Sequence, residues 1–122
     1  MKQAVFVVVQ FDDRTFAATT RPPFRHGEAG KIGFPGGGRH AGETLVEAAI
    51  RESVEEGWIV DGIESAPFYT AMVDVFEVSW FRAKTAMMLD SYKEIHRIKP
   101  ITATYDQLAM SGYGNDLALE AF

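Results

Sequence analysis

Residues 37–59 read GGRHAGETLVEAAIRESVEEGWI, a glycine-rich turn followed by a segment rich in glutamate. Thr44 and Glu47 form the T-x-x-E pattern that begins a helix, because each side chain satisfies a backbone amide that the first turn leaves free. The apolar stripe of this helix is expected to consist of Leu45, Val46, Ala49, Ile50 and Val54. Gly57 is expected to end the helix. This stretch therefore predicts a long amphipathic helix directly after a tight turn.

Three glutamates of this helix fall within one turn. Residues three and four apart share a helix face, so Glu52 is expected beside both Glu55 and Glu56. Like charges in these positions repel one another and destabilise a bare helix. A cation among the oxygens removes that cost, and carboxylates suit hard ions such as Mg2+, Mn2+ or Ca2+. The cluster therefore predicts a metal site, and the metal points to chemistry on phosphate.

The rest of the chain favours strands, because β-branched and aromatic residues recur in short runs. Strands are expected at 4–11, 15–20, 31–34, 58–62, 67–73 and 75–84. The glycines at 36–38 are expected to break the third strand, a helical turn is expected over 105–110, and a terminal helix over 115–122. Strands on both sides of one long helix predict an α/β fold, a mixed β-sheet between α-helices, in one domain spanning residues 1–122.

The composition excludes several classes of function. A formal net charge of -5 argues against a surface for extended nucleic acid, which needs an excess of lysine and arginine. The chain has no cysteine, so disulfides and thiolate metal sites are excluded, in keeping with a cytoplasmic location. The apolar run at 4–9 is too short for a signal peptide, and no stretch approaches the length of a membrane span.

Cleavage of a phosphoanhydride places specific demands on a protein. The substrate is strongly anionic, so divalent ions must neutralise phosphate oxygens, and a base must take a proton from the attacking water. The glycines at 36–38 permit backbone geometry that brings a peptide carbonyl to the same metal. Arg51 is expected to anchor the turn by pairing with Glu43, two helical turns earlier.

Six positions of this stretch follow the spacing G-x5-E-x7-R-E-u-x-E-E, in which u is a bulky aliphatic residue: Gly37, Glu43, Arg51, Glu52, Glu55 and Glu56. This spacing resembles the box of the Nudix hydrolase family. The motif covers about a fifth of the chain, and the order of strands and helix also resembles a minimal Nudix domain. The resemblance implies the Nudix fold and hydrolysis of a nucleoside diphosphate linked to a further group.

The resemblance also implies the ligands of the divalent cation. In the family, the glutamates that match Glu52, Glu55 and Glu56 bind the ion together with the backbone carbonyl of the residue that matches Gly37. Mg2+ is the expected cofactor, with Mn2+ as a substitute.

The identity of the general base stays open between Glu52 and Glu94. Relatives often complete the site with an acidic residue from a later loop, for which Glu94 is the candidate here and Asp90 the reserve. Two positions depart from the family pattern. Ser53 stands at the aliphatic position, which is expected to weaken packing under the helix, and Gly57 arrives one residue early, which is expected to shorten its end.

Arginines and one asparagine are candidates for binding the substrate. Arg21 and Arg39 are placed to steer a polyphosphate, since cations near an acidic site attract anions. Asn115 has two interpretations, a hydrogen bond to a purine edge, as in some relatives, or the N-cap of the terminal helix. Aromatic residues such as Phe6 and Phe76 are assigned to the core rather than to base stacking.

The favoured reaction converts a nucleoside or deoxynucleoside triphosphate to a monophosphate and pyrophosphate. This choice rests on the expectation that the protein lacks an N-terminal extension of the kind that nucleotide-sugar-hydrolysing relatives often use to dimerise and enclose the sugar. ADP-ribose-like compounds and nucleotide sugars, dinucleoside polyphosphates and capped RNA ends are the alternatives. A Nudix-fold module that binds a nucleotide without cleaving it is a further alternative, although such modules usually lose box glutamates. The expected assembly is a monomer or a homodimer.

Overall fold

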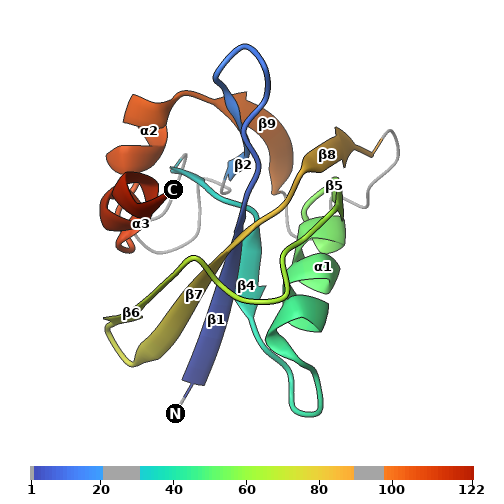
Figure 1. Cartoon of the computed structure of the whole chain (residues 1–122), viewed down its shortest axis with the longest axis vertical. Coiled ribbons are helices and arrows are strands. Elements are labelled where there is room, and N and C mark those ends of the chain that lie inside the picture. Colours follow the sequence, from blue (N-terminus) through green and yellow to red (C-terminus); the bar gives the residue numbers. More distant parts are fainter. Residues whose placement is uncertain (1, 21–30, 90–97) are drawn as a thin grey trace.

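The computed structural model describes residues 2–20, 31–89 and 98–122. Its centre is a four-stranded mixed sheet with the strand order β4-β1-β7-β6 (Figure 1). These strands are β1 (Lys2–Val8), β4 (Gly36–Gly38), β6 (Tyr69–Val73) and β7 (Phe76–Arg82). Strand β1 runs parallel to β7 and antiparallel to β4, and β6 runs antiparallel to β7. The sheet is therefore mixed, as the sequence predicted.

Two smaller groups of strands adjoin this sheet. One is a three-stranded sheet of order β3-β2-β9, built from β2 (Phe16–Thr20), β3 (Ile32–Gly33) and β9 (Lys99–Ala103). The other is a two-stranded ribbon of β5 (Trp58–Asp61) and β8 (Thr85–Met88). All three pairings are antiparallel.

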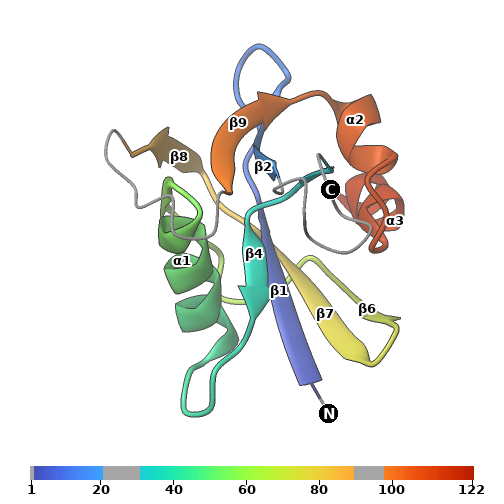
Figure 2. The same ribbon diagram turned by 180° about the vertical axis from the view of Figure 1, so that it is seen from behind.

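The described helices lie on opposite sides of the central sheet. Helix α1 (Leu45–Glu55) covers one side, and α2 (Tyr105–Ala109) and α3 (Asn115–Ala121) lie together on the other, as both views show (Figures 1 and 2). This arrangement confirms the predicted α/β fold with a mixed sheet between helices. No helix in the described part of the chain is long and apolar enough to cross a membrane.

Strand β1 is buried on both faces. Successive side chains of a strand point to opposite faces. Val5 and Val7 belong to the apolar cluster under α1, together with Ala49 of that helix. Phe6 and Val8 belong to the cluster on the side of α2 and α3. An uninterrupted apolar run is what a central strand covered on both faces requires.

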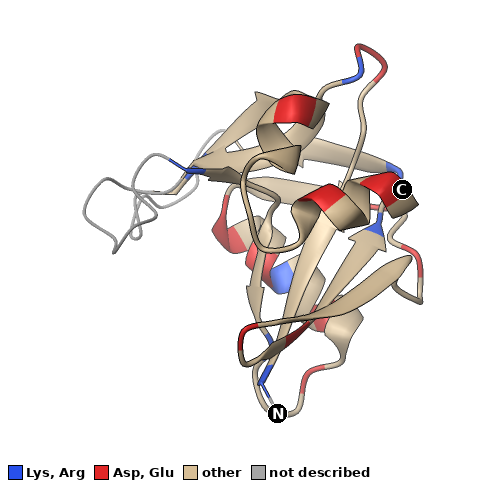
Figure 3. Cartoon of the chain, turned by 90° about the vertical axis from the view of Figure 1, so that its left-hand side faces the viewer, with Lys and Arg blue, Asp and Glu red and all other residues tan. Residues whose placement is uncertain are grey.

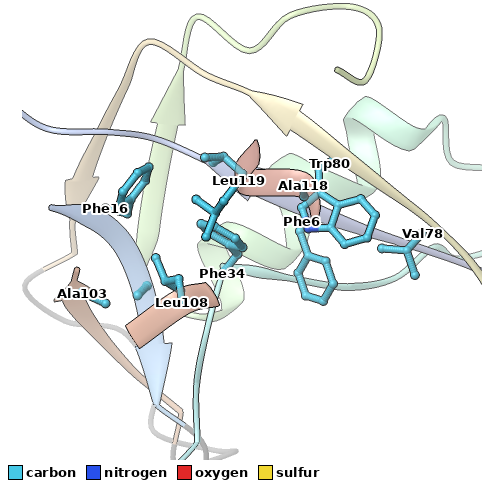
Figure 4. Close-up of a cluster of buried hydrophobic side chains, with 11 residues drawn as sticks. Phe6, Phe16, Phe34, Val78, Trp80, Ala103, Leu108, Ala118 and Leu119 are labelled. Carbon is cyan, nitrogen blue, oxygen red and sulfur yellow. The ribbon is translucent and has the colours of Figure 1, made fainter. Parts of the chain in front are cut away.

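The cluster under α2 and α3 contains three buried side chains that are linked by hydrogen bonds. Trp80 and Ala118 lie together within the cluster (Figure 4). The indole Nε1 of Trp80 donates to Asn115 Oδ1 at 3.0 Å, and Asn115 Nδ2 donates to Ser111 Oγ at 2.8 Å. The predicted cap by Asn115 is wrong, because Gly114 occupies the N-cap position of α3 and no side chain caps it. The Asn115 amide instead satisfies polar groups inside the cluster.

Helix α1 begins where the sequence predicted. Thr44 Oγ1 accepts from the amide of Glu47, and the Glu47 carboxylate accepts from the amide of Thr44, so the capping box is complete. The helix ends at Glu55 with Glu56 as its C-cap, and Gly57 follows with a left-handed φ of 94°.

The predicted apolar stripe of α1 is wrong at two positions. Ile50 and Val54 are 40% and 42% exposed, while Ala48, Ala49 and Ser53 are buried. Small side chains face the sheet because they let the helix approach it closely. The hydroxyl of Ser53 finds no hydrogen-bond partner among the residues that the structure describes.

Further differences concern the strands. The glycines at 36–38 form β4 instead of breaking a strand, and Gly36 pairs with Phe6 of β1. A Cβ on Gly36 would overlap the carbonyl oxygen of Val5, so the two strands meet more closely than any side chain permits. Strand β8 was not predicted, and β1 ends at Val8, earlier than expected.

Replacing Gly36 by alanine should destabilise the fold by at least about 3 kcal/mol, because the methyl group has no space beside the main chain of β1. Gly38→Ala is the matched control on the same strand, since a Cβ there meets nothing within 4 Å. The control should change stability by less than about 1 kcal/mol. Urea unfolding of both variants measures the difference, and equal stabilities would contradict this account of β4.

Candidate active site

Arg51 joins the glycine-rich turn to the acidic helix. Its Nε and Nη2 donate to the two carboxylate oxygens of Glu43, at 2.6 and 3.0 Å. Nη2 also donates to the carbonyl of Gly38 at 2.9 Å. The predicted pair of Arg51 with Glu43 is therefore confirmed. Glu43 accepts in addition from the amide of His40 at 2.8 Å, which closes the turn.

The same guanidinium lies between two of the box glutamates. Nη1 of Arg51 is 2.9 Å from Glu52 and 3.2 Å from Glu55. Arg51 is the basic residue of α1, and the other charged residues of that helix are glutamates. Figure 3 shows acidic and basic segments together on this helix. The hydrogen bonds that the Glu43 carboxylate accepts from Arg51 and from the His40 amide lower the pKa of Glu43 to about 2. The hydrogen bond to Glu43 raises the pKa of Arg51 most, and the contacts with Glu52 and Glu55 raise it further.

The three glutamates occupy three different environments. A Cβ on Gly37 would lie 2.5 Å from a carboxylate oxygen of Glu52, so that carboxylate packs against the main chain of β4. Glu56 is buried, and its carboxylate accepts from the amide of Gly36 at 2.8 Å. The side chain of Glu55 is 49% exposed. Within residues 2–20, 31–89 and 98–122, no three His, Cys, Asp or Glu side chains are already arranged around a common point where a metal would sit.

The chemistry of the donors nevertheless fits a hard cation. Carboxylates from α1 and its C-cap meet two neighbouring residues of β4, Glu56 at Gly36 and Glu52 at Gly37. A side chain at position 37 would fill the space that the Glu52 carboxylate occupies, which explains why glycine stands there. Oxygen donors of this kind are those that Mg2+ and Mn2+ prefer.

Arg39 holds the turn in place. Its Nε donates to the side-chain oxygen of Gln3 at 2.8 Å, and its Nη1 donates to the carbonyl of Glu43 at 2.9 Å. Gln3 in turn donates to Glu77 of β7 at 3.0 Å. These contacts tie the turn to β1 and β7. They give Arg39 a structural task that the sequence analysis did not foresee, and no pattern in the sequence marked Gln3.

The other predicted site residues divide into two groups. Arg21, Asp90 and Glu94 lie outside the described residues. Asn115 lines a cavity, but both ends of its amide already bond to Trp80 and Ser111. Its position therefore fits a residue that holds the cavity wall in place.

A cleft opens beside Gly37. Its larger part has a volume of about 380 Å³ and is lined mainly by apolar and aromatic side chains, among them Phe6, Phe76 and Tyr113. The smaller part, about 130 Å³, adds Lys31 and Asn115 to its lining. Phe6 and Phe76 were assigned to the core, and both do pack there, but each also forms part of the cleft wall. The acidic site and an apolar cleft of ligand size thus share one border.

A family model of the NUDIX domain matches residues 1–92. The chain belongs to the Nudix family. Nudix hydrolases act on nucleoside diphosphate derivatives and generally use divalent metal ions, so the predicted enzyme class, a hydrolase of phosphoanhydrides, is confirmed. No curated protein matches the sequence.

Solved Nudix structures share the fold of this Nudix protein. The MutT Nudix hydrolase from Burkholderia pseudomallei is 19% identical with a TM-score of 0.76, and the match covers 98% of this chain and 96% of that one. A MutT structure from work on Aliivibrio salmonicida and Vibrio cholerae is 19% identical with a TM-score of 0.71, over 98% and 95% of the chains. An ADP compounds hydrolase is 19% identical with a TM-score of 0.75, over 98% and 70%. At these identities the likeness establishes the fold.

Replacing Gly37 by alanine should reduce hydrolysis by about 100-fold, because the new methyl group displaces the Glu52 carboxylate from its place on β4. The fold should survive, since the displaced group is the end of a flexible side chain. Steady-state hydrolysis and thermal unfolding of Gly37→Ala and Gly38→Ala test this pair. Full activity in Gly37→Ala would show that the position of Glu52 does not matter.

The stability of this Nudix protein should fall in acid partly through Glu43. The pKa of Glu43 is about 2 in the folded state against 4.5 for a free glutamate, so its contribution is complete above pH 4.5 and is lost as the pH falls towards 2. Glu43→Gln should lower the unfolding temperature at pH 7 and flatten its decline below pH 4.5. Glu47→Gln is the control, because glutamine keeps the capping box. Parallel curves for wild type and Glu43→Gln would contradict the assignment.

Proposed function

We propose that this protein is a Mg2+-dependent pyrophosphohydrolase that cleaves a nucleoside or deoxynucleoside triphosphate to a monophosphate and pyrophosphate. The observation that carries the proposal is the border at Gly37, where the Glu52 carboxylate packs on one side and the apolar cleft opens on the other. A nucleotide has the same two parts, an apolar ring and an anionic chain. Its base fits the cleft, and its phosphates then reach the acidic site.

The residues of the Nudix box have different proposed roles at this site. Glu52, Glu55 and Glu56, with the backbone carbonyl of Gly37, would hold Mg2+ or Mn2+, and the ion supplies charge neutralisation for phosphate oxygens and a lowered pKa for bound water. Either Glu52 or Glu94 takes the proton of the attacking water. Arg51 holds the carboxylates of Glu52 and Glu55 in position, because its Nη1 lies 2.9 Å from the first and 3.2 Å from the second.

Cations around the cleft would attract the substrate. Arg21 is proposed to contact the polyphosphate, and Lys31 lines the smaller part of the cleft near Gly37. Arg39 and Asn115 remain proposed substrate-site residues, although their described contacts favour a positioning role for both.

The volume of the cleft favours a substrate with one nucleoside. A cavity of about 380 Å³ lies at the lower end of the range for small-molecule sites. The second candidate substrate is an ADP-ribose-like compound or a nucleotide sugar, which the similarity to an ADP compounds hydrolase supports. We further propose one Nudix domain over residues 1–122, acting as a monomer or a homodimer in the cytoplasm.

Glu55→Gln should reduce Mg2+-dependent hydrolysis by about 100-fold or more, because a neutral amide replaces a proposed metal ligand. The fold should persist, since the Glu55 side chain is half-exposed. Glu47→Gln on the first turn of the same helix is the matched control and should retain full activity. Assays of nucleoside triphosphates, ADP-ribose and a dinucleoside polyphosphate with Mg2+ measure the effect.

The same panel separates the alternatives. Release of pyrophosphate from a triphosphate supports the proposed reaction. Turnover of ADP-ribose with no triphosphate cleaved would reassign the substrate, and nucleotide binding without turnover would identify a non-catalytic module. Unchanged turnover in Glu55→Gln would show that the active site lies elsewhere.

A further inference from the structure

A chain of hydrogen-bonded side chains begins on β7, a strand outside the Nudix box. Glu77 of β7 lies opposite Gln3 of β1 in the parallel pairing, and its Oε1 accepts from Gln3 Nε2 at 3.0 Å. The other end of the same amide, Gln3 Oε1, accepts from Arg39 Nε at 2.8 Å. Strands β7, β1 and β4 lie side by side in this order, and Arg39 directly follows β4 (Figure 2). One glutamine amide thus connects the two inner strands of the sheet to the glycine-rich turn.

The chain continues through Glu43, which two arginines hold by different groups. Nη1 of Arg39 donates to the main-chain carbonyl of Glu43 at 2.9 Å. The carboxylate of Glu43 accepts from Nε and Nη2 of Arg51 at 2.6 and 3.0 Å. Nη1 of Arg51 then contacts Glu52 and Glu55. The position of the turn at Glu43 therefore determines where the guanidinium of Arg51 lies, and with it two proposed metal ligands.

Glutamine is suited to the place that Gln3 occupies. Its side chain has a carbonyl oxygen, which accepts from a cation, and an NH2 group, which donates to an anion. A glutamate would accept from Arg39 but would place a second carboxylate opposite Glu77, where like charges repel. A leucine would make neither contact. The place between Arg39 and Glu77 requires an uncharged side chain that accepts at one end and donates at the other.

Stability of the fold does not explain these contacts. Gln3, Arg39 and Glu77 are all half-buried, so water can replace their partners, and polar contacts in such places have a small net free energy. The apolar clusters on both faces of β1 hold the sheet together without them. A need to fix the turn, and through it the acidic site, does explain them.

We propose that Gln3 is a positioning residue for the divalent cation, and that its amide raises the affinity of the site for the ion by fixing, through Arg39, the turn that holds Arg51. This inference rests on the proposed function, because it takes the box glutamates as the ligands. Removal of a group that orients metal ligands typically weakens metal binding by about 10- to 100-fold. Since Gln3 acts through intermediate groups, the lower end of that range, about 10-fold, applies to it.

The first experiment measures the binding of Mn2+ alone by electron paramagnetic resonance. Gln3→Leu loses both contacts without a change in net charge, so its Kd for Mn2+ should rise by about 10-fold. Gln10→Leu is the matched control, because it makes the same replacement at an exposed position shortly after β1, and it should keep the Kd of the wild type. An equal Kd for Gln3→Leu and the wild type would overturn the proposal.

An exchange of the two partners tests the contacts themselves. In the double variant Gln3→Glu with Glu77→Gln, the new carboxylate at position 3 accepts from Arg39 and from the new amide at position 77. Both hydrogen bonds persist, the second with its direction reversed, and the net charge stays that of the wild type. The double variant should therefore bind Mn2+ within about twofold of the wild type. A loss as large as that of Gln3→Leu would show that these contacts do not set the affinity.

NMR follows the effect along the chain of contacts without any metal. The Arg51 Nε–H donates to Glu43 at 2.6 Å, so the wild type should give a sharp signal for it that exchanges slowly with water. The signal should broaden or exchange faster in Gln3→Leu, because the turn is no longer fixed, and stay unchanged in Gln10→Leu. An unchanged signal in Gln3→Leu would show that the influence of Gln3 does not reach Arg51, and the proposal would fail.

Kinetics and stability separate positioning from a defect in the fold. Gln3→Leu should raise the Mg2+ concentration for half-maximal hydrolysis by about 10-fold, whereas kcat at saturating Mg2+ should stay within about threefold. Its unfolding temperature without metal should stay within about 5 °C of the wild type. A kcat that saturating Mg2+ does not restore, or a larger fall in the unfolding temperature, would assign Gln3 to the fold and overturn the proposal.

The measurements on Mn2+ keep the test independent of catalysis. If the wild type binds Mn2+ but cleaves no nucleotide, the proposed function fails, and the Kd values of Gln3→Leu and the double variant still decide the role of Gln3. If nucleotides are cleaved while all Kd values are equal, the positioning role alone fails.

Discussion

The guanidinium of Arg51 is the constraint on which the site depends. It bonds to Glu43 in the turn, to the main chain of β4 at Gly38, and to Glu52 and Glu55 on α1. Three segments that the chain could otherwise hold at different angles are thereby fixed to one planar group. Five donors in a rigid plane make arginine suited to this task, and lysine would not replace it. The same positive charge offsets the repulsion among the box glutamates.

A second set of contacts attaches the glycine-rich turn to the central sheet. Arg39 links the turn to Gln3 of β1, and Gln3 links to Glu77 of β7. Because β1 and β7 are the two inner strands of the central sheet, the acidic site is attached to the middle of that sheet. Binding groups that must meet a polyphosphate benefit from such support, since their positions then cost little to maintain.

The features that the sequence predicted correctly are local. The capping box of α1 and the pair of Arg51 with Glu43 depend on residues within about two helical turns, where spacing determines geometry. The resemblance to a known family supplied the fold and the enzyme class. Strand β4 was missed because its glycines fit against Val5 and Phe6, which lie far away in the sequence.

Other differences have the same origin. Ile50 and Val54 look like core residues by periodicity, but the helix uses alanine and serine for its contact face. Asn115 follows a glycine at the start of a helix, as a cap would. Its side-chain amide is instead held inside the core by hydrogen bonds to Trp80 and Ser111. The backbone angles at Tyr113 could not be derived from spacing, although two flanking glycines were a signal that left-handed geometry was available.

The pairing of β1 has a consequence for biosynthesis. This strand leaves the ribosome before its parallel neighbour β7, which ends at Arg82, so the whole segment between the two must be translated before they can join. Until then a run of five consecutive apolar residues, Val5 to Val9, stays without its main partner in the nascent chain. Such a segment is prone to self-association, and parallel pairing between distant strands is slow. A strand that is covered on both faces in the finished protein is thus exposed while the chain is being made.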